Sequence, residues 1–220
     1  MGMAVSVSFT YGQEFSRTSR IETDSTIECY HFKIEVPVGL SFIDKGRSHN
    51  YHTARFHFPE EQTQTKVLSD RIDTQMRTHM VMLGGNTSHY AEENITAAGG
   101  QVTMRGGMTI NSDPTQYISE LRPALSQPIN LELHLGHGGA WIDLSDLRTR
   151  GVEIMSSASD IFFTYSKPNL ERMHVLKIDN AMGKIVLRNL EFARAEQISV
   201  ENGMGDTKIM LGAQSFGASY

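Results

Sequence analysis

The stretch that decides the fold reads Leu131-Glu-Leu-His-Leu-Gly-His-Gly-Gly-Ala-Trp-Ile-Asp-Leu144. Apolar residues alternate with polar or small ones on both sides of a glycine-rich centre. Alternation at period two predicts β-strands, and the glycines predict a sharp corner between them. One such strand–corner–strand unit has an apolar face that it cannot cover alone, so further copies are expected to stack on it.

Three further copies follow at a spacing of about 21 to 24 residues. The positions equivalent to Leu133 are Ile154, Ile178 and Val200. Small residues stand three and five positions after each of them, at Gly136 and Gly138, Ser157 and Ser159, Ala181 and Gly183, and Gly203 and Gly205. The sequence therefore predicts a β-solenoid, similar to a β-helix, with four coils in residues 128–220. The alternative is a set of antiparallel hairpins whose glycine turns look alike.

The region before the repeat is also rich in strand signals. Strands are expected at Ile27–Val36, Leu40–Ile43, Ala54–Pro59, Met80–Leu83 and Gln101–Met104. Pro37 and Gly39 indicate a bulge or a strand edge between the first two. A short helix is expected from Pro114 to Ala124, because Asp113 is a good helix cap and proline suits the first helical position. The predicted fold class is thus all-β, with a strand-rich region at 1–127 continuous with the solenoid at 128–220.

Composition excludes several classes of protein. Net charge is −5, and no segment combines clustered Lys and Arg with aromatic residues, so nucleic acid is not expected as a partner. The apolar runs are too short for a membrane span. Cys29 is the single cysteine, which excludes an intrachain disulfide and a multi-cysteine zinc site. The first residues lack the features of a signal peptide, which fits either a cytoplasmic protein or one whose leader has been removed.

Several blocks of the repeat resemble one family. These are the stretch 131–144 already quoted, Val152-Glu-Ile154, Pro168-Asn169, Gly183-Lys-Ile-Val-Leu187-Arg-Asn-Leu190 and Val200-Glu-Asn-Gly-Met-Gly-Asp206. They resemble the toast-rack family of bacterial domains, which is close to the C-terminal domain of LiaF-like cell-wall stress proteins and to auto-transporter adhesin domains. The resemblance implies a β-solenoid of the cell envelope, on the extracytoplasmic side, with no assigned catalytic residues. The chain departs from the pattern at Ser157 and Ser159, which replace glycines, and it lacks the membrane segments of many relatives.

Histidines and aromatic residues are the candidates for a binding site. His49, His52 and His57 are close in sequence, but strand alternation separates them onto different faces, so no metal site is expected there. Trp141 and Phe162 fall on positions expected to face solvent, where aromatic side chains offer a surface to a partner or a stacking platform to a sugar. His134 and His137 flank the first corner and belong to the same candidate surface. The alternative is that these aromatic side chains pack in the core, as aromatic side chains in strands usually do.

The sequence favours a non-catalytic envelope domain that acts as a binding or assembly scaffold, in adhesion or in the envelope-stress response. We expect no catalytic residues, no metal and no cofactor, and a protein or cell-wall polymer as partner. Unpaired edges at the last coil also predict a homo-oligomer. The alternative is a carbohydrate-active lyase or glycosidase with two converging carboxylates, drawn from acids such as Glu132, Asp143, Glu153, Asp160, Asp179 and Glu201.

Overall fold

The computed structural model describes residues 5–11, 14–58, 64–83 and 114–212. In these residues thirteen strands form one sheet, accompanied by two single-turn 3-10 helices. The strands are β1 (Val5–Tyr11), β2 (Glu14–Glu22), β3 (Cys29–Ile43), β4 (Tyr51–Phe58), β5 (Gln64–Ile72), β6 (Gln75–Leu83), β7 (Ile118–Arg122), β8 (Pro128–Asp143), β9 (Arg148–Thr164), β10 (Met173–Met182), β11 (Ile185–Arg188), β12 (Ala195–Met204) and β13 (Thr207–Met210). The helices are η1 (Pro114–Gln116) and η2 (Leu190–Ala193). The predicted all-β class is confirmed.

Parallel pairing connects the strands of the repeat. β8 pairs with β9, β9 with β10, and β10 with β12, always in parallel. The register places Leu133 beside Ile154, Ile154 beside Ile178, and Ile178 beside Val200. These are the positions that the sequence repeat equates. Antiparallel hairpins are excluded for these strands, because hairpin partners run in opposite directions.

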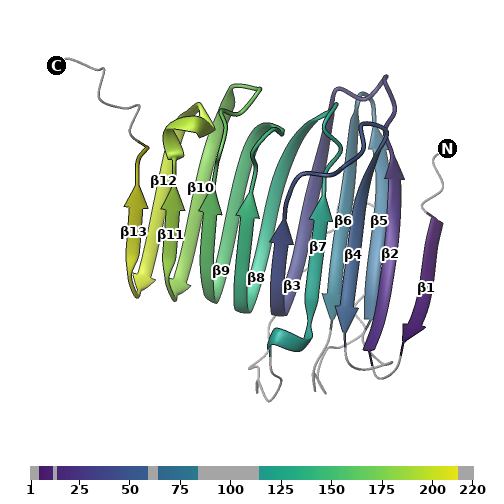
Figure 1. The fold of residues 1–220 in the computed structure, drawn as a ribbon, viewed down its shortest axis with the longest axis horizontal. Coiled ribbons are helices and arrows are strands. Elements are labelled where there is room, and N and C mark those ends of the chain that lie inside the picture. The colour runs from purple at the N-terminus through teal and green to yellow at the C-terminus, as the bar shows by residue number, and fades with distance from the viewer. Residues whose placement is uncertain (1–4, 12–13, 59–63, 84–113, 213–220) are drawn as a thin grey trace.

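The long strands bend and take part in two layers (Figure 1). The first half of β9 pairs with β10, whereas its second half pairs with β11. β3 likewise pairs with β6 through its first half and with β7 through its second. Side chains that point between the two layers form the hydrophobic core, which includes Phe32, Ile34, Leu133, Ile142, Ile154, Phe163, Ile178 and Leu187. The opposite side chains of these strands therefore lie on the two outer faces.

β3 forms one more rung of the stack, meaning one more strand–bend–strand unit, which the sequence repeat did not contain. It pairs in parallel with β8 along nearly its whole length, with Ile34 beside Leu133 and Gly39 beside Gly138. The chain then leaves the stack and forms β4 to β7 before it returns at β8. The sheet is continuous across the expected boundary near residue 127, and the division at that point stays a prediction.

One local expectation before the repeat was wrong, and another was wrong in part. The helix expected from Pro114 to Ala124 is limited to η1, and Ile118–Arg122 form β7 between β3 and β4. Pairing with two strands outweighs a helix signal that is worth only a fraction of a kcal/mol per residue. No strand edge separates Val36 from Leu40, because β3 runs through and bends at Gly39 (φ 144°). The strand expected at Gln101–Met104 lies outside the described residues.

Polar side chains hold the bend from within. Asn180 Nδ2 donates to the carbonyl of Ser159 at 3.2 Å and lies 3.2 Å from Asn202 Oδ1. Asn202 Nδ2 in turn donates to the carbonyl of Gly183 at 3.1 Å. Because a buried carbonyl without a partner costs free energy, these amides stabilise the bends of successive rungs.

Gly138→Ala should destabilise the protein by about 2 kcal/mol or more. Gly138 has a φ of 142°, and a Cβ there would lie 2.0 Å from the carbonyl oxygen of Gly39 in the next rung. Chemical denaturation measures the loss in the free energy of unfolding. Ser157→Ala, at an exposed position near the same bend, is the control and should change it by less than about 0.5 kcal/mol. Equal effects of the two variants would contradict this account of the bend.

Candidate functional site

Three aromatic side chains form a row on the outer face of one layer. This layer contains β7, β11, β13 and the second halves of β3, β8 and β9. Phe42 of β3, Trp141 of β8 and Phe162 of β9 are neighbours in the register. The rings of Phe42 and Trp141 are stacked with centroids 5.2 Å apart, and those of Trp141 and Phe162 with centroids 5.3 Å apart. Trp141 is 40% exposed, although its neighbours Ala140 and Ile142 are buried. We call Phe42, Trp141 and Phe162 the aromatic row.

An open groove of about 390 Å³ lies along the aromatic row. Its other border consists of Asp44, Asp143, Thr164 and Arg188, which come from successive rungs. The two carboxylates thus lie at one end and the guanidinium at the other. Arg188 is exposed and forms no ion pair with the described residues. The groove therefore combines a rigid apolar side with a charged side of defined polarity.

The two carboxylates of the groove also hold local turns. Asp143 Oδ1 accepts a hydrogen bond from the backbone N–H of Ser145 at 3.0 Å and another from its hydroxyl. Asp44 Oδ1 accepts one from the N–H of Lys45 at 2.7 Å. One oxygen of each carboxylate therefore has a structural role.

Both faces of the Trp141 ring are covered by the neighbouring rings, so Trp141 presents its edge to solvent. The planes of Trp141 and its two neighbours differ by only 12° and 13°, so each ring covers the next. A sugar that stacks on a protein needs a free ring face. The groove is consequently better suited to a partner with apolar side chains than to a stacked sugar, for which the sequence predicted a platform.

The structure does not bring the two histidines of the candidate surface to the aromatic row. His134 belongs to the first half of β8, on the opposite outer face, and its Nε2 lies 2.8 Å from Glu132 Oε1. His137 lies at the bend, beside Val38 and Ala158. The four residues Trp141, Phe162, His134 and His137 are therefore not one site.

His134 belongs to a charged cluster on that opposite face. Lys33 Nζ lies 3.1 Å from Glu35 Oε1 and 3.5 Å from Glu132 Oε1, and His79 Nε2 lies 3.3 Å from Glu35 Oε1. Burial raises the pKa of Glu35, but hydrogen bonds from His79 and Lys33 outweigh it and lower the pKa to about 2. Glu35 is thus held as a carboxylate, and its charge is neutralised within the cluster.

The trio of histidines near residue 50 is also dispersed, as alternation predicts. His52 is completely buried against the rings of Tyr30 and Phe32, whose centroids lie 4.3 and 4.9 Å away. His57 faces outward, with its Nε2 4.0 Å from Glu120 Oε1, and His49 is exposed. In the part of the chain that the structure describes, no group of three or more His, Cys, Asp or Glu side chains is placed to hold a metal ion.

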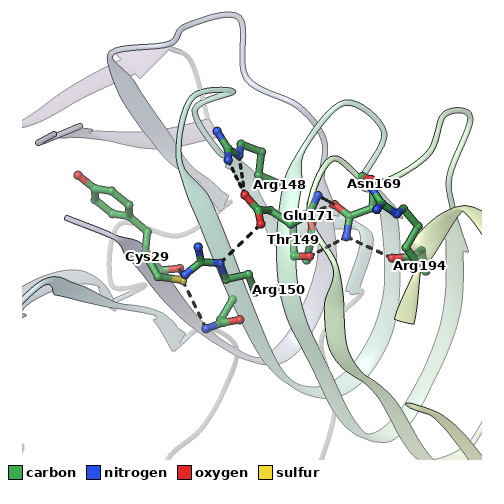
Figure 2. Close-up of polar contacts among 10 residues, drawn as sticks. Cys29, Arg148, Thr149, Arg150, Asn169, Glu171 and Arg194 are labelled. Carbon is green, nitrogen blue, oxygen red and sulfur yellow. Dashed lines mark hydrogen bonds and ion pairs between the residues drawn. The ribbon is translucent and has the colours of Figure 1, made fainter. Parts of the chain in front are cut away.

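A polar network braces the corner opposite the bend (Figure 2). Glu171 lies between two arginines, with Arg148 Nε donating to its Oε1 at 2.9 Å and Arg150 Nε 4.0 Å from its Oε2. Asn169 is buried and joins rungs, because its Nδ2 donates to the carbonyls of Thr149 and Ala193. Each charged side chain and the side-chain amide described here has a partner within the protein, so we assign the network a structural role.

Cys29 lies near this network and is buried. The amide of Asn130 lies 3.5 Å from its sulfur. Burial raises the pKa of the thiol. A protonated, covered thiol is a poor nucleophile, so Cys29 is a packing residue.

Sequence reasoning missed Phe42, Asp44 and Arg188. Phe42 and Asp44 belong to the β3 rung, which lies far from the repeat in the chain. A signal for Arg188 was present, since Val186 and Arg188 occupy the positions equivalent to Phe162 and Thr164.

No helix of the described residues has the length and hydropathy to span a bilayer.

Comparison with solved structures gave two matches, of which one supports a likeness of fold. A proposed cell adhesion protein from Clostridium sporogenes has a similar fold, with a TM-score of 0.61 and 12% sequence identity over 90% of this chain and 100% of that one. A proposed adhesin from Parabacteroides merdae aligns over 90% of this chain and 96% of that one, at 9% identity, but its TM-score of 0.20 carries no argument. No protein-family model and no curated protein sequence matches the chain. At these identities the likeness establishes the fold alone.

His52 should make the fold sensitive to mild acid. Burial lowers its pKa to about 3, whereas in the unfolded chain it titrates near its ordinary value of 6.5. The unfolded state therefore binds a proton first, and stability should fall by about 1.4 kcal/mol per pH unit as pH drops below about 6.5. Denaturation at several pH values between about 6.5 and 5 measures this slope.

His52→Gln should flatten that slope, because a glutamine amide does not titrate and its oxygen can still accept from the N–H of Ala124, which now donates to His52 Nδ1 at 3.0 Å. His49→Gln, at an exposed histidine, should keep the wild-type slope. If His52→Gln and wild type lose stability equally over this range, His52 is not the group responsible.

Proposed function

We propose that the protein is a non-catalytic, adhesion-like binding domain of the bacterial cell envelope, in which a β-solenoid serves as a rigid scaffold. Its binding surface is the groove along the aromatic row, and its partner is an extended segment of a protein or of a cell-wall polymer. The observation that carries this proposal is the in-register row of the half-buried Phe42 and Phe162 and the exposed Trp141 beside a charged border. We also propose that the domain lies on the extracytoplasmic side of the envelope.

Three considerations support this function. Exposed aromatic side chains on a rigid support are typical anchors of binding interfaces. The groove crosses several rungs, so it fits a ligand that is long in one direction. The fold also resembles that of a proposed cell adhesion protein, which agrees with a role in holding another surface.

Charge complementarity defines the orientation of the partner. Asp44 and Asp143 favour a cationic group at one end of the groove, and Arg188 favours an anionic group at the other. An apolar middle section would lie against the ring edges. Peptides and amino-acid-bearing cell-wall polymers both meet this description.

Glycan cleavage is a second candidate, because Asp44 and Asp143 line the same groove and follow the paired residues Ile43 and Ile142. Two carboxylates beside one sugar are the requirement of glycosidases. Their hydrogen bonds within local turns favour a structural role instead.

Binding is measurable directly, because Trp141 is the only tryptophan of the chain and lies in the groove. Titration with soluble peptidoglycan fragments, and with peptides selected on the immobilised protein, should shift its fluorescence emission. Phe162→Ala should weaken binding about tenfold or more, since truncation of an aromatic anchor costs more than about 1.4 kcal/mol. Leu170→Ala, at an exposed apolar residue outside the groove, is the matched control and should bind normally. Ligands that bind without a change in Trp141 emission, and equally to Phe162→Ala, would exclude this groove.

A reducing-end assay on peptidoglycan and on β-linked glycans distinguishes the second candidate. The binding proposal predicts no turnover by wild type. Turnover that disappears in Asp44→Asn or Asp143→Asn, but persists in Glu153→Gln on the opposite face, would establish catalysis in the groove and overturn the non-catalytic reading.

A further inference from the structure

The last described rung of the stack exposes two side chains, Ile198 and Ile209, whose equivalents in the preceding rungs are buried. We call residues 195–212, which contain β12 and β13, the end coil. Four of the ten exposed large hydrophobic residues of the described chain lie in it: Ile198, Met204, Ile209 and Leu211. This concentration sets the end coil apart from the other outer surfaces.

Register identifies Ile198 and Ile209 as core positions without a cover. Ile198 is 44% exposed, whereas Val152 and Leu176 in the same inward row are fully buried. Ile209 is 52% exposed, whereas Phe163 and Leu187 in its row are at most 1% exposed. The difference arises because each inward side chain is covered by both neighbouring rungs, and the last rung has one neighbour.

The backbone of the end coil is open in the same direction. Among the described strands, β12 pairs only with β10 and β13 only with β11. N–H and C=O groups point alternately to the two sides of a strand, so half of those in β12 face away from β10. An open edge with an apolar side is a template for another strand.

We propose that a second copy of this chain covers the end coil, with the two end coils paired about a two-fold axis. A two-fold axis perpendicular to the stack sets β12 against β12 of the partner subunit in antiparallel orientation, and β13 against its own counterpart. The two strands then match in length, and the inward rows of both copies join into one core. The pairing also closes the assembly, because each copy has one end coil.

Two observations favour a second copy over other occupants. The pairing continues an interface that the chain already makes between its own rungs, with the same apolar inward row. The opposite end of the stack is built differently, because antiparallel strands β1, β2 and β4 continue the sheet there.

Sedimentation velocity over a wide range of protein concentration tests the proposal. Wild type should sediment as a dimer that dissociates on dilution. The double variant Ile198→Glu with Ile209→Glu should shift the dimer dissociation constant by at least about a hundredfold, because it places four carboxylates in the joined core. Leu68→Glu and Leu170→Glu introduce the same charge at exposed apolar positions outside the end coil and should leave the dimer intact.

Hydrogen–deuterium exchange provides a second readout that does not depend on a charged variant. Amides of β12 should exchange more slowly at high protein concentration, while those of β5 should be unaffected. A wild type that is monomeric at every concentration would overturn the proposal, as would a dimer that the double variant leaves unchanged. Slow exchange in β12 that is independent of concentration and is lost on deletion of residues 213–220 would also overturn it, since the chain would then cover its own end coil.

Discussion

The inward row of aliphatic side chains from Ile34 through Leu133, Ile154 and Ile178 is the constraint on which the rest of the structure depends. A slip of one residue in any rung would turn its apolar set toward solvent, so burial of this row fixes the register of each strand on the next. Fixed register places the bends above one another. Glycine is then required where backbones meet, and Asn180 and Asn202 find carbonyls at regular intervals.

The same register creates the groove on the outside. Phe42, Trp141 and Phe162 stack because their inward neighbours are aligned, and the charged border follows the same order. Neither the aromatic row nor the charged border depends on a loop for its position. A surface of this kind is straight and preorganised, which reduces the entropy lost when an extended partner binds.

Much of the fold could be predicted from sequence, because the repeat is local and recurs. Leu133, Ile154, Ile178 and Val200 were equated from spacing alone, and the register pairs them. The β3 rung was not found, since β4 to β7 separate it from β8 and no spacing connects Phe42 with Trp141. The helix at Pro114 had genuine local signals, but its residues β-pair on both sides. Of the candidate site, Trp141 and Phe162 were identified because large aromatics stood at outward positions. Arg188 had a signal in its equivalence with Thr164, whereas Asp44 required the three-dimensional arrangement.

The position of β1 and β13 at opposite edges of the sheet affects how the fold carries a pulling force (Figure 1). Tension applied between these edges acts along the hydrogen bonds and across the strands. It would load one rung at a time, beginning at an edge, rather than shear a whole ladder at once. In a protein that holds another surface, such a scaffold would lengthen stepwise under tension, and each released rung would absorb work while the remaining rungs stay folded.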